Sequence, residues 1–146
     1  MAPQCLVYQG LTRGYRANIH GEEQTINFSP EDYWTGDREA LLTGKPTNVN
    51  IEALVDTDLL LLEKADFDRL CIEVAPFSEF MTNLIQRNLL AYQKRLQETR
   101  GFTDDEKVLA FINKFPTVVS RAPLHTLATY LDIDPYNLKF LLSTLS

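Results

Sequence analysis

The clearest pattern of hydrophobic and polar residues in this chain runs from Pro76 to Thr99. Apolar residues recur there at intervals of three or four, which predicts one long amphipathic helix. Proline is tolerated in a first helical turn, and Gly101 is a suitable residue to end the helix. At about 1.5 Å per residue the helix would be roughly 35 Å long. A small domain does not need such a length, so we expect a strut, a dimer contact, or both.

Before this helix, polar and apolar residues alternate over short distances, which indicates β-strands. The expected strands are Cys5–Gln9, Leu11–Ile19, Gln24–Phe28, Val49–Leu54 and Leu59–Glu63. Gly14 can introduce a bulge, and His20-Gly21 is a hairpin signal. The leucines at 59–62 have no clear period, but their short run beside the turn residues 56–58 favours a buried strand. Short strands at these intervals favour a sandwich or barrel over an alternating α/β fold.

The segment 33–46 separates two groups of expected strands. It contains one short helical pattern, Asp37–Leu42, between Gly36 and Gly44. Such an insertion in a β-roll can form the wall of a small-molecule pocket. Alternatively, it is a connection whose aromatic side chains plug the open end of the roll. A further helical pattern, Lys64–Val74, leads into the long helix.

The last forty-five residues have the pattern of short helices. Thr103 followed by Glu106 is a capping box, and it opens a helix that ends near Lys114. Two more short helices are expected at Pro123–Tyr130 and Pro135–Leu145, and the tight turn between them is typical of a helix-turn-helix. The alternative is a helical hairpin that serves only for packing.

Individual positions support the helix-turn-helix. Ala128 is small where the two helices would cross, and Ile133 is apolar where the turn must face inward. Asp134 and Pro135 suit the N-cap and the first helical position. Asp132 stands where glycine is usual, and aspartate accepts the left-handed conformation better than most residues. The other apolar positions that the motif needs are filled by Leu127, Leu131, Leu138 and Leu141.

Composition narrows the class of protein. With 45% hydrophobic and 10% aromatic residues the chain can bury a core. Its net charge of −6 argues against a strongly basic nucleic-acid binder, although a local basic face remains compatible with it. The sequence has no apolar run of about 20 residues and no signal-peptide pattern. We therefore expect a cytoplasmic protein that does not enter a membrane.

The residues that most enzymes need are scarce. Cys5 and Cys71 lack the spacing of a metal site or a redox pair, and we expect them to be reduced structural thiols. His20 falls at the expected hairpin tip and His125 in the helix-turn-helix, so a shared cupin-type metal site is not expected. No phosphate-binding loop and no nucleophile–base pattern can be placed. We expect no enzyme activity, no catalytic residue, no metal and no cofactor.

A β-roll, a long helix and a terminal helix-turn-helix, in this order, resemble the Crp/Fnr (cyclic-AMP receptor protein-like) family of bacterial transcription regulators. The most specific segments are Gly10–Arg16 with Glu22–Phe28, Leu41–Pro46, Ile51–Leu54 and Arg121–Pro123, which are similar to members found in the Bacteroidetes. The resemblance covers nearly the whole chain and implies an α+β fold. It implies a partial antiparallel β-roll of the cyclic-nucleotide-binding type (a cupin-like jelly roll) at 1–75, a dimerisation helix at 76–100, and a helix-turn-helix bundle without a wing at 101–146.

The resemblance also implies a homodimer, an effector pocket in the roll, and DNA binding by the last helix. The expected dimer interface is Met81, Ile85, Leu89, Tyr92 and Leu96. Under the roll we expect Phe77, Phe80 and Leu84. The candidates for the effector pocket are Tyr33, Trp34, Gly36, Asp37, Thr47 and Asn48. The candidates for DNA binding are Tyr136, Asn137, Lys139, Phe140 and Ser143.

Three features depart from the family pattern. The chain begins inside the roll, without the family's leading helix and strands, so we expect a truncated or shortened form with exposed sheet edges. The stretch Thr47–Asn50 has no arginine for a cyclic phosphate, which needs charge-assisted hydrogen bonds when it is buried. The last helix has one lysine, although phosphate contacts from lysine and arginine supply most DNA affinity.

Two hypotheses therefore remain. The first is a Crp/Fnr-type transcription regulator with an unknown effector that is not cyclic AMP. The alternative is a dimeric sensor or interaction protein that keeps the same fold and has lost DNA binding.

Overall fold

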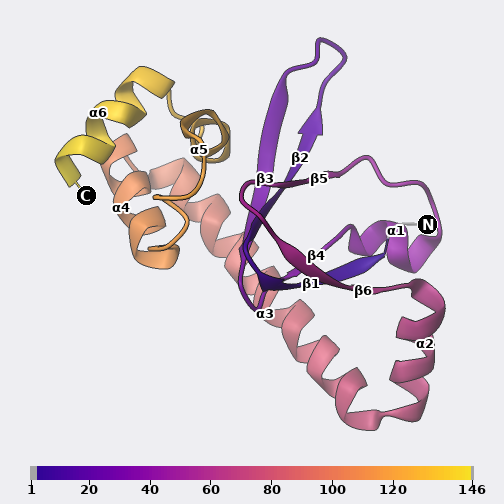
Figure 1. The fold of residues 1–146 in the computed structure, drawn as a ribbon. Helices are drawn as coiled ribbons and strands as arrows, with labels where there is room; N and C mark the ends of the chain where they lie inside the picture. Colours follow the sequence, from indigo (N-terminus) through magenta and orange to yellow (C-terminus); the bar gives the residue numbers. More distant parts are fainter. Residues whose placement is uncertain (1–2, 146) are drawn as a thin grey trace.

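The computed structural model describes residues 3–145, apart from the side chain of Leu42, and it begins with two antiparallel sheets (Figure 1). The strands are β1 (Gln4–Gln9), β2 (Leu11–Ala17), β3 (Glu23–Pro30), β4 (Trp34–Thr35), β5 (Asn50–Ala53) and β6 (Asp58–Leu62). One three-stranded sheet has the order β4-β1-β6 and the other has the order β3-β2-β5. We call these six strands the roll.

Helices make up most of the remaining described chain. They are α1 (Arg38–Thr43), α2 (Lys64–Glu73), α3 (Ala75–Gly101), α4 (Asp104–Lys114), α5 (Leu124–Leu131) and α6 (Pro135–Leu145). Figure 1 shows α3 passing beneath the roll, with α2 beside its first half and α4–α6 gathered at its far end. We call α4–α6 the helical module. The predicted α+β fold, with a roll, a long helix and a terminal group of helices, is confirmed.

Local sequence signals account for many of the boundaries. The register of β2 and β3 shifts between Gly14 and Tyr15, as the predicted bulge requires. The Thr103 side chain caps α4, and Glu106 completes the capping box. Asp132 ends α5 in the left-handed conformation with φ of 55°. The hairpin turn between β2 and β3 is longer than predicted because the Asn18 side chain accepts hydrogen bonds from the backbone N–H groups of His20 and Glu22.

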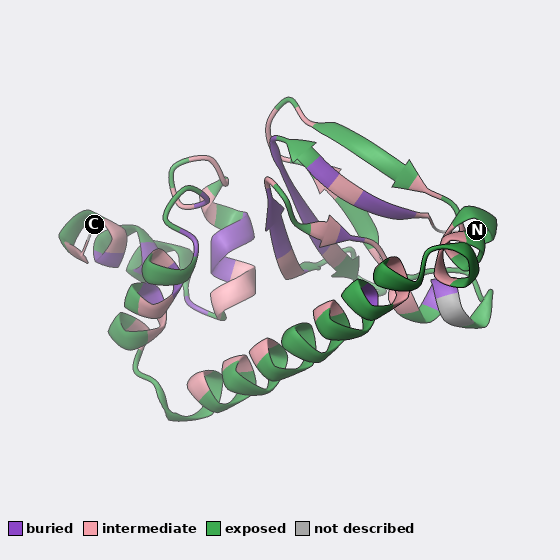
Figure 2. Ribbon diagram, turned by 90° about the horizontal axis from the view of Figure 1, so that it is seen from below, coloured by how far each residue is buried: buried purple, intermediate pink, exposed green. Residues whose placement is uncertain are grey.

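The hydrophobic core lies between the roll and the helical module. It joins Leu11 and Phe28 of the roll to buried residues of all three module helices. Figure 2 shows buried residues on β2, β3 and α5 where the two parts face each other, whereas α3 is exposed along most of its length. The two parts are therefore held together by one shared core.

Three predictions of burial are wrong. The run 59–62 does form a strand, but it is not buried: Leu60 is 56% and Leu61 66% exposed, because no described element covers these side chains of β6. Phe80 is 47% exposed rather than packed under the roll. Met81 is only 4% exposed within the single chain, so it cannot contribute much to a dimer interface. Within residues 3–145, no helix is long and apolar enough to span a bilayer.

Candidate functional site

The turn between α5 and α6 is closed by hydrogen bonds at both of its ends. The backbone N–H of Ile133 donates to the carbonyl of Ala128 at 3.1 Å, which closes the turn. The carboxylate of Asp134 accepts hydrogen bonds from the N–H groups of Tyr136 and Asn137 and so caps α6. The inward-facing anchors Ala128, Ile133, Leu138 and Leu141 are all buried.

The outer face of α6 is open to solvent. Tyr136 is 88% and Phe140 64% exposed, and Lys139 and Ser143 are exposed as well. The Asn137 amide donates to the carboxylate of Asp104 in α4 at 2.8 Å. All five predicted DNA-binding residues are exposed, but the Asn137 amide is engaged by the neighbouring helix and the Ser143 hydroxyl donates to the carbonyl of Phe140.

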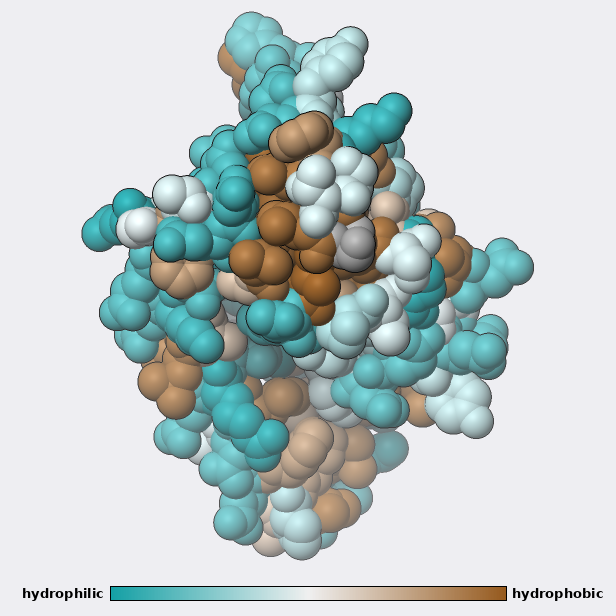
Figure 3. All heavy atoms as spheres, turned by 90° about the vertical axis from the view of Figure 1, so that its left-hand side faces the viewer, coloured by the Kyte–Doolittle hydropathy of each residue, from teal (hydrophilic) through white to brown (hydrophobic). Residues whose placement is uncertain are grey.

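This side of the molecule is also apolar. Figure 3 views the molecule from the left of Figure 1, where α4 and α6 lie, and shows hydrophobic side chains gathered on that face. Leu109 of α4, at 42%, and Phe140 of α6 are the exposed large apolar residues of these two helices, beside the aromatic Tyr136. Lys139 is the basic residue that α6 offers to a phosphate.

Arginine side chains connect the helical module to the roll. The Arg95 guanidinium of α3 donates to the carbonyl of Ile26 in β3 and to that of Tyr130 in α5, each at 2.8 Å. It also lies 3.7 Å from the centre of the Tyr130 ring. Arg121, between α4 and α5, donates to the carbonyl of Gly10 and to both carboxylate oxygens of Glu31.

The Glu31–Arg121 pair changes the acidity of the carboxyl group. The hydrogen bonds from Arg121, together with the N–H of Gly10, lower the pKa of Glu31 from 4.5 to about 2. A carboxylate at the end of β3 and a guanidinium before α5 thus join the roll to the segment that leads into α5.

Hydroxyl groups and aromatic rings complete this junction. The Thr129 hydroxyl of α5 donates to Thr25 Oγ1 at 2.8 Å and accepts from the Thr25 N–H at 3.1 Å. The Phe28 ring of β3 meets Phe111 and Tyr130 edge-on, at 5.7 and 5.1 Å between ring centres. The pKa of Tyr130 is raised because its ring is buried there.

The predicted effector-pocket residues do not form one cluster. Tyr33 packs its ring against Phe115 of the helical module, at 5.9 Å between ring centres. Asp37 caps α1 and accepts a hydrogen bond of 2.7 Å from Thr47, so those two residues do meet. Asn48 instead accepts from Arg16.

The other pocket candidates are also used structurally. Trp34 pairs with Leu6 in the sheet and is half-buried. Gly36 has φ of 138°, and a Cβ there would come within 2.7 Å of the Gln4 side chain. Two hollows in the described part of the chain lie at other places, one beside α3 and α4 and one at the β2–β3 turn.

Arg13 is a buried charged residue that the sequence pattern did not single out. It is 1% exposed and forms ion pairs with Glu23 and Glu52 at 2.7 and 2.8 Å. It also donates to Thr25, and so connects β2, β3 and β5 to the Thr25–Thr129 contact with α5. An arginine in a strand followed by acidic partners in other strands has no distinctive local pattern, which is why this network could not be read from the sequence.

The expected dimer contact lies on an open side of α3. Ile85, Leu89, Tyr92 and Leu96 are 42%, 56%, 55% and 43% exposed and recur with helical spacing. We call these four residues the α3 stripe. It is a continuous apolar strip on a helix whose one buried residue is Met81.

The comparison with known protein families identifies a domain class for the N-terminal half of the chain. Residues 4–73 match the family model of the cyclic nucleotide-binding domain, so the roll with α1 and α2 is similar to that domain. No curated protein matches this sequence.

Solved structures extend the likeness to the whole chain. FixK2 from Bradyrhizobium japonicum superimposes with a TM-score of 0.82 at 16% identity, over 98% of this chain and 74% of FixK2. A protein described as a regulator of the Crp/Fnr family from Eubacterium rectale gives 0.70 at 16% identity, over 97% of this chain and 68% of that one. A mutant of CooA from Carboxydothermus hydrogenoformans gives 0.71 at 17% identity, over 98% and 66%. The predicted resemblance to the Crp/Fnr family is confirmed, and the chain has the fold of these solved structures.

Proposed function

We propose that this chain is a cytoplasmic Crp/Fnr-type transcription regulator that binds DNA through α6, as a homodimer, under the control of an effector other than cyclic AMP. The observation that carries the proposal is the α5–α6 unit. Its second helix is capped by Asp134, anchored by the buried Leu138 and Leu141, and open on the opposite face. A short second helix with a free face is the element that helix-turn-helix proteins insert into the major groove.

The chemistry near α1 argues against cyclic AMP as the effector. A cyclic phosphate in a roll requires a cation that donates hydrogen bonds. The stretch 47–50 supplies no such cation, and Arg16, whose charge adds to the Thr47 hydrogen bond in lowering the pKa of Asp37, is engaged by Asn48 at 3.3 Å. A buried cyclic phosphate would therefore lack the dedicated arginine that it requires.

The α3 stripe supports the homodimer. Four large apolar residues on one side of a long helix expose surface that a second copy of the same helix can cover. In a symmetric dimer the two stripes would meet each other, as a two-fold axis requires. Two α6 helices would then face the same DNA duplex.

A salt titration tests DNA binding. Fluorescence anisotropy with a pool of random-sequence duplexes, followed by selection of the tightest binders, gives affinity as a function of salt. We expect Lys139→Gln to weaken binding to all sequences and to reduce the salt slope by about one, the value for a single lysine–phosphate interaction. Lys45→Gln is the matched control, because Lys45 lies in an exposed loop of the roll, and it should change neither quantity.

A second function is favoured by one observation, the exposed apolar side of α4 and α6. Tyr136 and Phe140 are aromatic, Asn137 is held by Asp104, and α6 adds one lysine. Such a face suits a protein partner better than a phosphate backbone. This alternative is a dimeric sensor or interaction protein without DNA affinity. The absence of any DNA binding at low salt, by a folded dimer, would overturn the regulator proposal and support the alternative.

A further inference from the structure

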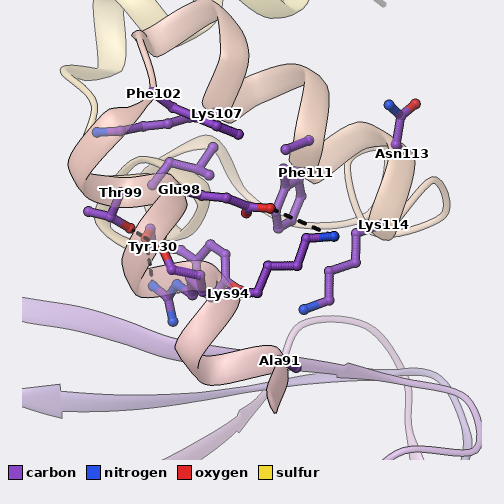
Figure 4. Close-up of a pocket in the computed structure, with 13 residues that line it drawn as sticks. Ala91, Lys94, Glu98, Thr99, Phe102, Lys107, Phe111, Asn113, Lys114 and Tyr130 are labelled. Atoms are coloured by element: carbon purple, nitrogen blue, oxygen red, sulfur yellow. Dashed lines mark hydrogen bonds and ion pairs between the residues drawn. The ribbon is translucent and has the colours of Figure 1, made fainter. Parts of the chain in front are cut away.

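A cleft of about 720 Å³ lies between the second half of α3 and the helical module. Its walls come from α3, α4 and the end of α5, and Figure 4 shows side chains from these elements pointing into it. The volume falls within the range of small-molecule sites, which are typically a few hundred to about 1,000 Å³. It is separate from the residues around α1 that the sequence suggested as the effector pocket.

The cleft is cationic, although the chain as a whole carries a net charge of −6. Its charged lining consists of Lys94, Arg95, Lys107 and Lys114 against the single carboxylate of Glu98. Glu98 lies 4.0 Å from Lys94, which is a long ion pair. Among the described residues, no carboxylate lies within ion-pair distance of Lys107 or Lys114.

The two unpaired lysines lie on the same side of α4. Lys107 and Lys114 are seven residues apart, which is about two helical turns or roughly 10 Å. Burial and the nearby charges of Arg95 and Lys94 lower the pKa of Lys114, while Glu98 acts in the opposite direction. Lys94 and Lys114 reach into the same space from facing helices (Figure 4). This concentration of positive charge is unfavourable until an anion joins it.

Apart from Thr99 and Asn113, the uncharged walls of the cleft are apolar or aromatic. Phe111 is 5% exposed and lies behind the charged groups, and Tyr130 and Phe102 line the cleft as well. Aromatic walls with a few charged groups are the usual surroundings of a ligand that has a ring and an acidic group. We propose that this cleft binds a small aromatic anion, with its ring beside Phe102 and Tyr130 and its acidic group between the lysines of α3 and α4.

The position of the cleft gives the ligand a structural effect. Arg95 and Tyr130 line it and also form the bonds that hold α3, β3 and α5 together. A ligand there stabilises the docked arrangement of the helical module, because it binds only when these walls are in place. Of the cleft residues of α3, Ala91, Lys94 and Glu98 lie on a different side of the helix from the α3 stripe, whereas Thr99 lies at the edge of the stripe.

Isothermal titration calorimetry with 1-naphthyl phosphate tests the proposal on the full chain. We expect saturable binding and a rise in the thermal unfolding midpoint. 1-Naphthol, which lacks the phosphate, and inorganic phosphate, which lacks the ring, should each bind at least about tenfold more weakly. Lys107→Gln and Lys114→Gln should each weaken binding by about fivefold to tenfold, as the loss of one charge-assisted hydrogen bond predicts. Lys45→Gln, far from the cleft, should leave the affinity unchanged.

Ala110→Trp provides a variant that fills the cleft without changing its charge, since Ala110 lines it. It should abolish binding while circular dichroism confirms the fold. Wild-type affinity in both lysine variants would overturn the proposal. So would the absence of saturable binding of 1-naphthyl phosphate and of 1-naphthoate at millimolar concentrations by the folded wild-type chain. Because no DNA enters these measurements, their outcome is independent of the outcome for DNA binding.

Discussion

Phe28 and Leu61 are both large apolar residues of strands, yet Phe28 is 2% and Leu61 66% exposed. Phe28 belongs to β3, which faces α5 and the rings of Phe111 and Tyr130. Leu61 belongs to β6, an edge strand that pairs with β1 on one side. The helix that follows it, α2, has no buried residue. The junction with the helical module is therefore a closed core, and the β6–α2 side of the roll is an open apolar surface.

This difference shows where the stability of the chain resides. At the junction, hydrogen bonds from Arg95, Arg121 and Thr129 satisfy polar groups that burial would otherwise leave without partners. On the β6–α2 side, apolar residues add to the surface without contributing to a core. An exposed strand edge with leucines is also a surface on which another strand can pair. The roll and the helical module therefore stabilise each other through their shared core.

Truncation of Phe28 tests this contrast most strongly. Phe28→Ala removes a ring from a closed aromatic cluster, so we expect a loss of about 3–5 kcal/mol in the free energy of unfolding. Leu61→Ala removes an exposed side chain and should change it by about 0.5 kcal/mol or less. Urea unfolding followed by circular dichroism measures both. Equal losses for the two variants would mean that the β6–α2 side is covered in solution.

The same contrast explains what the sequence could predict. The caps at Thr103 and Asp134 and the bulge at Gly14 depend on residues close in the chain, and all three are confirmed. The run 59–62 was correctly predicted as a strand and wrongly as buried, because burial depends on what covers a strand. The sequence shows which face of a strand is buried only when apolar and polar residues alternate. Four consecutive leucines do not alternate, so they do not indicate a buried face.

In the candidate site, too, the features that depend on nearby residues could be predicted and those that depend on tertiary contacts could not. The anchors of α6 follow from helical spacing, and the structure buries them. Arg95 and Arg121 could not be recognised, because several of their partners are backbone carbonyls, which have no sequence signature. The cationic cleft arises only when α3 and α4 fold against each other. Met81 was assigned to the dimer interface because it shares the spacing of the α3 stripe, but its own chain buries it.

The α3 stripe allows a second test of the open side. Leu89→Glu places a carboxylate in the proposed dimer contact, where burial without a partner costs several kcal/mol. We expect the dissociation constant of the dimer to rise by at least about 100-fold, or roughly 3 kcal/mol. Sedimentation equilibrium measures it. Leu90→Glu is the matched control, because Leu90 is 66% exposed on the same helix but lies outside the stripe. Dimers of unchanged affinity for Leu89→Glu would place the interface elsewhere.

A smaller effect is expected from the hydroxyl contact at the junction. Thr129→Val keeps the shape of the side chain but leaves the Thr25 N–H without the acceptor it has at 3.1 Å. The loss should be about 1–2 kcal/mol in the free energy of unfolding, as for other buried polar groups that lose a partner. Thr99→Val is the control, since its exposed hydroxyl donates only to its own helix at Arg95. If both valine variants are equally stable, the Thr25–Thr129 contact does not hold the module in place.

The smallest expected effect concerns the ion pair at the edge of the junction, and it depends on pH. The pKa of Glu31 is about 2 in the folded chain and ordinarily 4.5, so its stabilising effect is complete above about pH 4.5 and is lost as the pH falls toward 2. Glu31 is 41% exposed, and solvent screening limits the contribution to about 1 kcal/mol. Glu31→Gln should therefore be less stable than the wild type by about 1 kcal/mol at pH 7, and this gap should close between pH 4.5 and 2. Urea unfolding across this range measures the gap, with Glu79→Gln, an exposed residue of α3, as the control. A gap that does not change with pH would show that the Glu31 charge plays no part in holding the helical module against the roll.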